Sequence, residues 1–205
     1  MDSVSRLRGT RTYLVGAMDR VPDGGAEWRQ RVTPFLEGKG ITVLNPCEKP
    51  IDVGVEDDEA RDKIEKYKQT GKFSRIKSEF GVIRTVDLRC VDISDFIVAS
   101  IDLDVHACGT YEEIAIANSQ KKPVLVWCQQ GKINVPNWLF FMLPHQHIFG
   151  DLDSLVEYID HVDTCRDEVD HHKRWFFFNR NNLPSVTLAA SSIRNIHDRN
   201  LKVVT

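Results

Sequence analysis

Short apolar runs alternate with amphipathic stretches along the chain from Thr12 to Val162. The run from Asp95 to Asp102 is almost continuously apolar, which is typical of a strand buried on both faces. The other apolar runs are short and end at Gly, Pro or a polar turn, as strands do. The pattern predicts strands over Thr12–Met18, Ile41–Pro46, Asp95–Asp102, Pro123–Cys128 and His147–Phe149.

The stretches between these runs have the period of an amphipathic helix. From Ala26 to Gly38, the side chains of Trp28, Val32 and Leu36 fall on one face, together with Phe35. Similar spacing predicts helices over about Ser78–Ser94, Tyr111–Gln120, Asn134–Leu143 and Asp151–Val162.

Regular alternation of strands and helices is the signature of a sheet with right-handed crossovers. We therefore expect an α/β fold: a doubly wound, flavodoxin- or Rossmann-like, mostly parallel five-stranded sheet with helices on both faces. Ligands of such sheets bind at the carboxyl ends of the strands. The turns after "YLVGA", "TVLNP" and "VASID" are therefore the places where we expect chemistry.

Two segments interrupt this rhythm. Residues from about 47 to 77 are rich in charge and poor in apolar side chains, which predicts a solvated, partly helical insertion. Residues 163–205 follow the last amphipathic stretch and include four consecutive aromatic residues in "RWFFFN". We predict one α/β domain over 1–162 and a C-terminal extension over 163–205, which packs on the core or at a subunit interface.

Composition narrows the class of protein. The 205-residue chain has a net charge of −3, so it lacks the basic field that attracts polymeric nucleic acid. No apolar run approaches the roughly 20 residues of a membrane span, and the N-terminal residues lack the core of a secretory signal. Five cysteines without a CxxC pair argue against a disulfide framework. We expect a cytoplasmic protein without a membrane or nucleic-acid partner.

Two acidic positions stand out. Asp87 shares a helical stripe with Ile83 and Cys90, and a carboxylate on a mostly apolar stripe needs a partner or a ligand. Glu113 is expected in the first turn of a helix that begins near Thr110, where unpaired N–H groups favour an anion. A plainer interpretation is that Thr110 caps this helix and the glutamates only satisfy its N-terminus. Glu112 is the sequence neighbour of Glu113, but a rotation of about 100° per residue lets only one of them face a cleft.

Several segments, taken in order, resemble the nucleoside 2-deoxyribosyltransferases and the related nucleoside 5'-monophosphate N-glycosidases. "DLRCVDISDFIVASID" matches the D-x7-D frame of that family before an apolar strand, and "GTYEEIAIANSQKKPV" matches its G-[TS]-x-x-E-[IL]-x-x-A pattern. The resemblance extends from about Thr12 to Ile159 and also includes "YLVGAM", "GGAEWRQRVTPFLEGKGITVLNP" and "INVPNW".

The resemblance implies a mechanism with two acids. Glu113 would be the nucleophile that attacks the anomeric carbon of a (deoxy)ribose. Asp87 would hold the base and protonate it as it departs. Another base or water would then release the sugar, and neither a metal nor an organic cofactor is required. The resemblance also implies a small-molecule nucleoside or nucleotide and a nucleobase as partners.

Further residues are expected to bind substrate. The resemblance places Asn134 in a segment that reaches the site of a neighbouring subunit, which implies a homo-oligomer with sites near the interface. It places Ala107 where the transferases carry Asp and the glycosidases carry Ser, so neither signature for the 5' end of the sugar is present. The candidate substrate-binding residues are Gly16, Ala17, Asp19, Arg20, Asp104, His106, Gly109, Thr110 and Asn134.

Three functions therefore remain open. The first is sugar transfer between bases, and the second is hydrolysis of a nucleoside 5'-monophosphate, with Arg20 near a phosphate. The third is a sensor or scaffold that binds nucleotides without turnover.

Overall fold

The computed structural model describes residues 5–49, 54, 56–165 and 173–175. The chain divides into two units, Met1–Arg174 and Trp175–Thr205, and the second lies outside the described residues apart from Trp175. Most of the expected C-terminal extension, including "RWFFFN" after Trp175, therefore falls outside the description. Its proposed packing stays a prediction, and the first unit is described by itself below.

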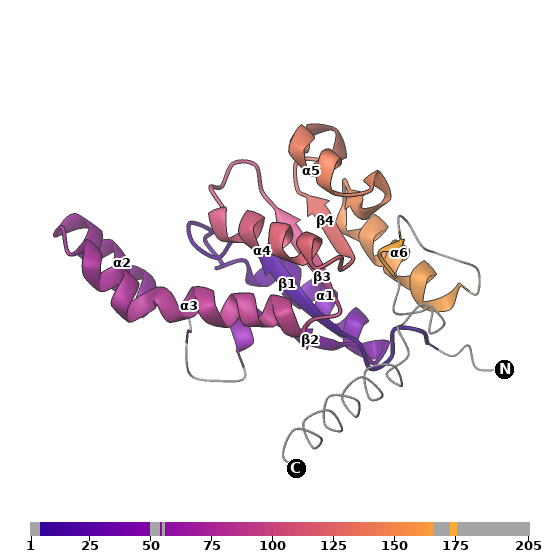
Figure 1. Ribbon diagram of the computed structural model, residues 1–205, viewed down its shortest axis with the longest axis horizontal. Coiled ribbons are helices and arrows are strands. Elements are labelled where there is room, and N and C mark those ends of the chain that lie inside the picture. The colour runs from indigo at the N-terminus through magenta and orange to yellow at the C-terminus, as the bar shows by residue number, and fades with distance from the viewer. Residues whose placement is uncertain (1–4, 50–53, 55, 166–172, 176–205) are drawn as a thin grey trace, which may run out of the picture. The chain divides into compact units, whose positions relative to one another are not determined.

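A five-stranded sheet forms the centre of the first unit (Figure 1). Its strand order is β2-β1-β3-β4-β5 and every pairing is parallel, which confirms the doubly wound α/β fold. Gly16 at the end of β1 lies opposite Ser100 of β3, so both strands end at the same edge of the sheet. The strands are β1 (Arg11–Gly16), β2 (Thr42–Leu44), β3 (Phe96–Ile101), β4 (Val124–Cys128) and β5 (Ile148–Phe149).

The helices follow the strands in the alternation that the sequence predicts. They are α1 (Ala26–Gly38), α2 (Asp58–Gln69), α3 (Phe73–Ile93), α4 (Cys108–Ser119), α5 (Asn137–Met142) and α6 (Leu152–Thr164), with short 3-10 turns η1 (Pro46–Glu48), η2 (Lys132–Asn134) and η3 (His145–His147). Among the described residues, no helix combines the length and the apolar character needed to cross a bilayer.

The alternation of side chains along the strands decides which residues meet α4. Tyr13, Val15, Ile97 and Ala99 point to the same face and pack in one buried cluster with Ile114 of α4. Their neighbours in sequence point to the opposite face of the sheet. The register of β1 thus places the ring of Tyr13 under α4, next to the position where a ligand of this fold would bind.

The charged insertion is more ordered than its composition suggests. It contains the whole of α2, and α3 begins at Phe73, five residues before the expected start at Ser78. Tyr67 is the buried residue of α2, and its hydroxyl donates to Glu79 of α3. α2 and the first turns of α3 extend away from the sheet, as Figure 1 shows. Tyr67, its ring contact with Phe80 and the ion pair between Lys63 and Glu79 join these helices. The apolar period was therefore too weak to predict α2 and the first turn of α3.

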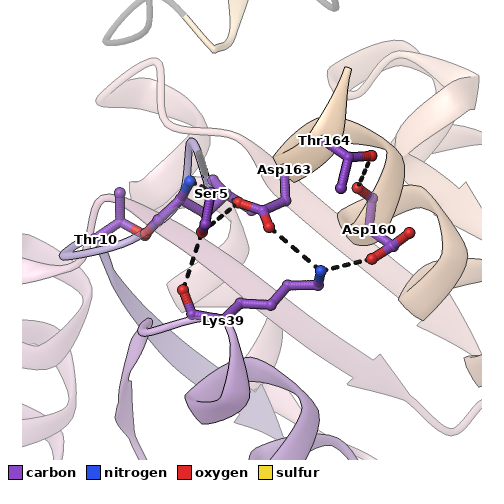
Figure 2. A network of polar contacts seen from close by, with 7 residues as sticks. Ser5, Thr10, Lys39, Asp160, Asp163 and Thr164 are labelled. Carbon is purple, nitrogen blue, oxygen red and sulfur yellow. Dashed lines mark hydrogen bonds and ion pairs between the residues drawn. The ribbon is translucent and has the colours of Figure 1, made fainter. Parts of the chain in front are cut away.

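A buried carboxylate ties the N-terminal segment to α6 (Figure 2). Asp163 is 3% exposed, and its Oδ1 accepts hydrogen bonds from the N–H of Leu7 at 2.8 Å and the hydroxyl of Ser5 at 2.7 Å. Lys39 donates to its Oδ2 at 3.3 Å and also pairs with Asp160. Burial alone would raise the pKa of Asp163, but these donors hold it below its usual value. The helix α6 therefore includes Asp163, which we had expected at the start of the extension.

We expect Asp163→Asn to lower the free energy of unfolding by about 1–3 kcal/mol, because the network loses its negative charge and one of its two acceptor oxygens. Asp160→Asn is the matched control. Asp160 is 54% exposed and should contribute less than about 1 kcal/mol. Urea denaturation at pH 7, followed by tryptophan fluorescence, measures both variants. Equal effects of the two substitutions would contradict the role given to Asp163.

Candidate active site

A cavity of about 360 Å³ lies at the carboxyl ends of β1 and β3. The end of β1 and the following loop supply one wall, from Gly16 to Arg20. The first turns of α4 supply another wall, and Asp87 of α3 and Pro46 of η1 also line the cavity. This is the position that the fold class predicts for a ligand.

The cavity brings together most of the residues singled out in the sequence. Asp87 and Glu113 both line it, although they come from different helices. Of the candidate substrate-binding residues, those that also line it are Gly16, Ala17, Asp19, Arg20, His106, Gly109 and Thr110.

Two candidates lie elsewhere in the described part of the chain. Asp104 is not among the residues that line the cavity, and its carboxylate accepts a hydrogen bond from Gln130 at 3.2 Å. The side-chain amide of Asn134 donates to the backbone oxygen of Gln130 at 2.6 Å. A role for Asn134 in binding requires a second copy of the chain and stays a prediction.

Glu113 is the most buried acid of the cavity. It is 8% exposed, and the phenol of Tyr13 donates a hydrogen bond to its Oε1 at 3.1 Å. Burial raises the pKa of Glu113 to about 8, and the negative charge of Asp87 acts in the same direction. The hydrogen bond from Tyr13 and the charges of Arg29 and Lys49 oppose this shift. The free protein therefore holds Glu113 mainly protonated at neutral pH.

The start of α4 corrects one expectation about Glu113. The helix begins at Cys108 after Ala107, and no side chain caps it. Thr110 is the third helical residue rather than the cap, and Glu113 lies in the second turn rather than the first. The error arose because "HAC" offers no capping side chain, so Thr110 was the first residue that could serve. Glu113 therefore owes its environment to burial and Tyr13, not to the unpaired N–H groups of the helix.

Glu112 and Glu113 have separate surroundings, as the rotation of the helix predicts. Glu112 does not line this cavity and forms a bidentate ion pair with Arg84 of α3. The Nε of Arg84 lies 2.8 Å from Oε2 of Glu112. This surface pair leaves Glu113 as the glutamate of α4 that faces the cavity.

Asp87 has the partner that its place on an apolar stripe requires. The Nζ of Lys49 lies 2.7 Å from Oδ1 of Asp87, in contact as an ion pair without the alignment of a hydrogen bond. The side chain of Lys49 is 2% exposed, and its ammonium also donates to the backbone oxygen of Gly54 at 2.6 Å. Since a buried ammonium needs a counter-charge, Asp87 and Lys49 stabilise each other as an ionic pair.

Sequence reasoning missed three residues of this site. Tyr13 could have been found from the alternation along β1, which turns it to the same face as Val15. Lys49 and Glu56 belong to the charged insertion, where nothing distinguishes them from their solvated neighbours. In the described part of the chain, no group of three or more His, Cys, Asp or Glu side chains is arranged to hold a metal ion.

A buried arginine shapes the loop after β1. The guanidinium of Arg29 is fully buried and donates to the backbone oxygens of Gly16 at 2.9 Å and Gly25 at 2.7 Å. Gly25 has a φ of 75°, and a Cβ there would lie 2.4 Å from the oxygen of Ala17. The loop that forms one wall of the cavity is therefore fixed by a charge and by the absence of a side chain.

Fold and site together define a doubly wound α/β protein with paired acids at the carboxyl edge of its sheet. The structure is similar to that of a 2-deoxyribosyltransferase from the psychrotolerant bacterium Bacillus psychrosaccharolyticus, with a TM-score of 0.50 and 18% sequence identity. The match covers 72% of this chain and 91% of the other. No family model matches the sequence, and comparison with curated proteins gives no significant match. This similarity supports the doubly wound α/β fold.

The raised pKa of Glu113 predicts a stability effect. The folded chain keeps this proton up to about pH 8, whereas the unfolded chain loses it near the ordinary value of 4.5. The free energy of unfolding should therefore fall as the pH rises between these values, by about 1.4 kcal/mol per unit at most. Glu113→Gln removes this loss and keeps an acceptor for Tyr13, so it should stabilise the protein at pH 7 by about 2–3 kcal/mol.

Urea unfolding at pH 5 and pH 7 tests this expectation, with the gain expected mainly at pH 7. Glu112→Gln is the control from the same helix and should give no such gain, because Glu112 is paired with Arg84 at the surface. A Glu113→Gln variant that is no more stable than the wild type at pH 7 would contradict the burial of a protonated carboxyl.

Proposed function

We propose that the protein cleaves the N-glycosidic bond of a (deoxy)nucleoside and transfers the sugar to another base. The observation that supports this most strongly is the buried carboxyl of Glu113, which shares one cavity with Asp87 and the phenol of Tyr13. Glycosyl transfer with retention needs one carboxylate under the anomeric carbon and a proton donor beside the leaving group. The similarity to a 2-deoxyribosyltransferase fold points to the same chemistry.

In this proposal Glu113 is the nucleophile. One oxygen of its carboxylate attacks the anomeric carbon while the electron pair of the C–N bond moves to the base. The positive charge that develops on the sugar is stabilised by the same carboxylate. A nitrogen of a second base then attacks the anomeric carbon and releases Glu113. Substrate binding has to favour the ionised form of Glu113, since the free protein holds the proton up to about pH 8.

Tyr13 orients the nucleophile. Its phenol donates to Oε1 of Glu113, which leaves Oε2 as the attacking oxygen. Because both side chains are buried, the phenol holds the carboxyl group in one orientation. Asp87 lies across the cavity lining, on α3, and we assign it to the side of the base.

A second candidate is hydrolysis of a nucleoside 5'-monophosphate. Arg20 and His106 line the same cavity next to the uncapped N-terminus of α4. A cation and free backbone N–H groups together favour a phosphate. Arg20 also lies 3.7 Å from the carboxylate of Asp19, which reduces the positive charge that it offers.

Incubation with 2'-deoxynucleosides, with and without a second free base, separates the candidate functions. The proposal predicts exchange of bases, measured by chromatography of the products, and a loss of on the order of 10³-fold or more in Glu113→Gln. Release of base from 5'-monophosphates alone would favour hydrolysis instead. Binding without any turnover would contradict both enzymatic proposals.

Tyr13→Phe should lower kcat/KM by roughly ten- to hundred-fold, because the carboxyl of Glu113 loses its fixed orientation. Tyr111→Phe is the control. Tyr111 lies on the same helix as Glu113, is 36% exposed and does not line the cavity. Steady-state kinetics of base exchange measures both variants, and equal kinetics for Tyr13→Phe and the wild type would rule out an orienting role.

A further inference from the structure

A further acidic residue, from the charged insertion, lines the cavity. Glu56 lies just before α2 and lines the cavity together with Asp87 and Glu113. The same three residues line a neighbouring hollow of about 590 Å³, whose walls include Ile83 and Leu88. Glu56 therefore lines both spaces, as do the two acids that the proposed reaction uses.

The carboxylate of Asp87 is engaged by a buried cation. Its Oδ1 is 2.7 Å from the ammonium of Lys49, whose side chain is 2% exposed. A neutral Asp87 would leave that ammonium buried without its counter-charge. Asp87 is therefore suited to accept a hydrogen bond from a base, for example from an amino or ring N–H group, while its Oδ1 lies against Lys49.

The environment of Glu56 favours the opposite state. Burial raises the pKa of Glu56 above its ordinary value. The charges of Arg61 and Lys49 oppose this shift, and those of Asp19 and Asp87 add to it. The cation of Lys49 is engaged by Asp87 and by the backbone oxygen of Gly54. A partly buried carboxyl that lines the cavity and has a raised pKa has the character that a general acid requires.

We propose that Glu56 donates the proton to the departing base, while Asp87, held by Lys49, binds the base as an acceptor. This inference rests on the proposed glycosyl transfer.

The proton balance of the reaction is complete with Glu56 in this role. As the C–N bond breaks, its electron pair moves to the ring nitrogen of the base, which takes the proton of Glu56. Glu113 forms its bond to the anomeric carbon, and the base leaves neutral. In the second half, the acceptor base returns its N–H proton to Glu56 as its nitrogen bonds to the anomeric carbon and Glu113 departs. Glu56 is then protonated and Glu113 ionised again, as in the substrate complex at the start of the cycle.

A pair of substrates distinguishes proton donation from binding. 2'-Deoxyguanosine needs a proton on its leaving base, whereas 7-methyl-2'-deoxyguanosine already carries a positive charge and releases a neutral base without one. In Glu56→Gln, we expect single-turnover release of guanine to slow by about 10²-fold or more, since general acids contribute about 10²–10⁴-fold. Release of 7-methylguanine should change less than about three-fold, which also shows that the variant is folded.

Two further variants complete the experiment. Asp87→Asn should slow the two substrates to a similar extent, because it weakens binding of the base rather than proton transfer. Glu59→Gln, an exposed glutamate three residues after Glu56, should behave as the wild type on both.

The outcomes separate this inference from the proposed function. A selective loss with deoxyguanosine in Asp87→Asn, or equal behaviour of Glu56→Gln and the wild type, would overturn the role of Glu56 while glycosyl transfer stands. A wild-type protein that cleaves neither substrate, in the presence or absence of an acceptor base, would overturn the proposed function itself.

Discussion

The burial of Glu113 against the phenol of Tyr13 is the constraint on which the site depends. A carboxyl group that is 8% exposed can be kept only with a hydrogen-bond partner, and the register of β1 supplies that partner from beneath α4. The same burial that raises its pKa also makes a carboxylate effective once a substrate is bound, because charges interact more strongly away from water. The cost to stability is thus located at the position where chemistry is proposed.

The acids that line the cavity differ in their charged neighbours and in the effect of burial. Lys49 gives Asp87 an ionic partner, whereas Glu56 and Glu113 lie where burial outweighs the nearby cations. Lys49 and Glu56 both come from the segment between β2 and α3, which contributes little to the core. The insertion therefore places Lys49 against Asp87 and Glu56 on the lining of the cavity. Similar carboxyl groups of one cavity thus have different charged neighbours.

Much of the fold could be predicted from the sequence, because the apolar period of 2.0 or 3.6 residues reflects burial directly. The prediction of element boundaries was wrong where single side chains, rather than an apolar period, decide where a helix begins. α3 begins earlier than expected because the hydrogen bond of Tyr67 and the ion pair of Lys63, both to Glu79, hold α2 against it in place of an apolar stripe. The start of α4 was misplaced because Ala107 offers no cap.

The site shows the same division. Asp87 was found because it interrupts an apolar stripe and falls in the D-x7-D frame. Glu113 was found from its motif, since its expected place in the first turn of the helix was wrong. The contact between Tyr13 and Glu113 joins residues 100 positions apart, so no local pattern could reveal it. Lys49 and Glu56 were hidden among solvated charges, whereas Asp104 and Asn134 lie outside the cavity of the single chain.

The central claim, that Glu113 is the nucleophile of a glycosyl transfer, can be tested by trapping the covalent intermediate. A nucleoside of 2-deoxy-2-fluoroarabinose slows the second half of such a reaction, so mass spectrometry of the intact and digested protein should find one sugar attached at Glu113. A sugar attached to another residue would contradict this claim. So would a wild-type protein that exchanges bases rapidly without any adduct, together with a Glu113→Gln variant whose exchange is undiminished.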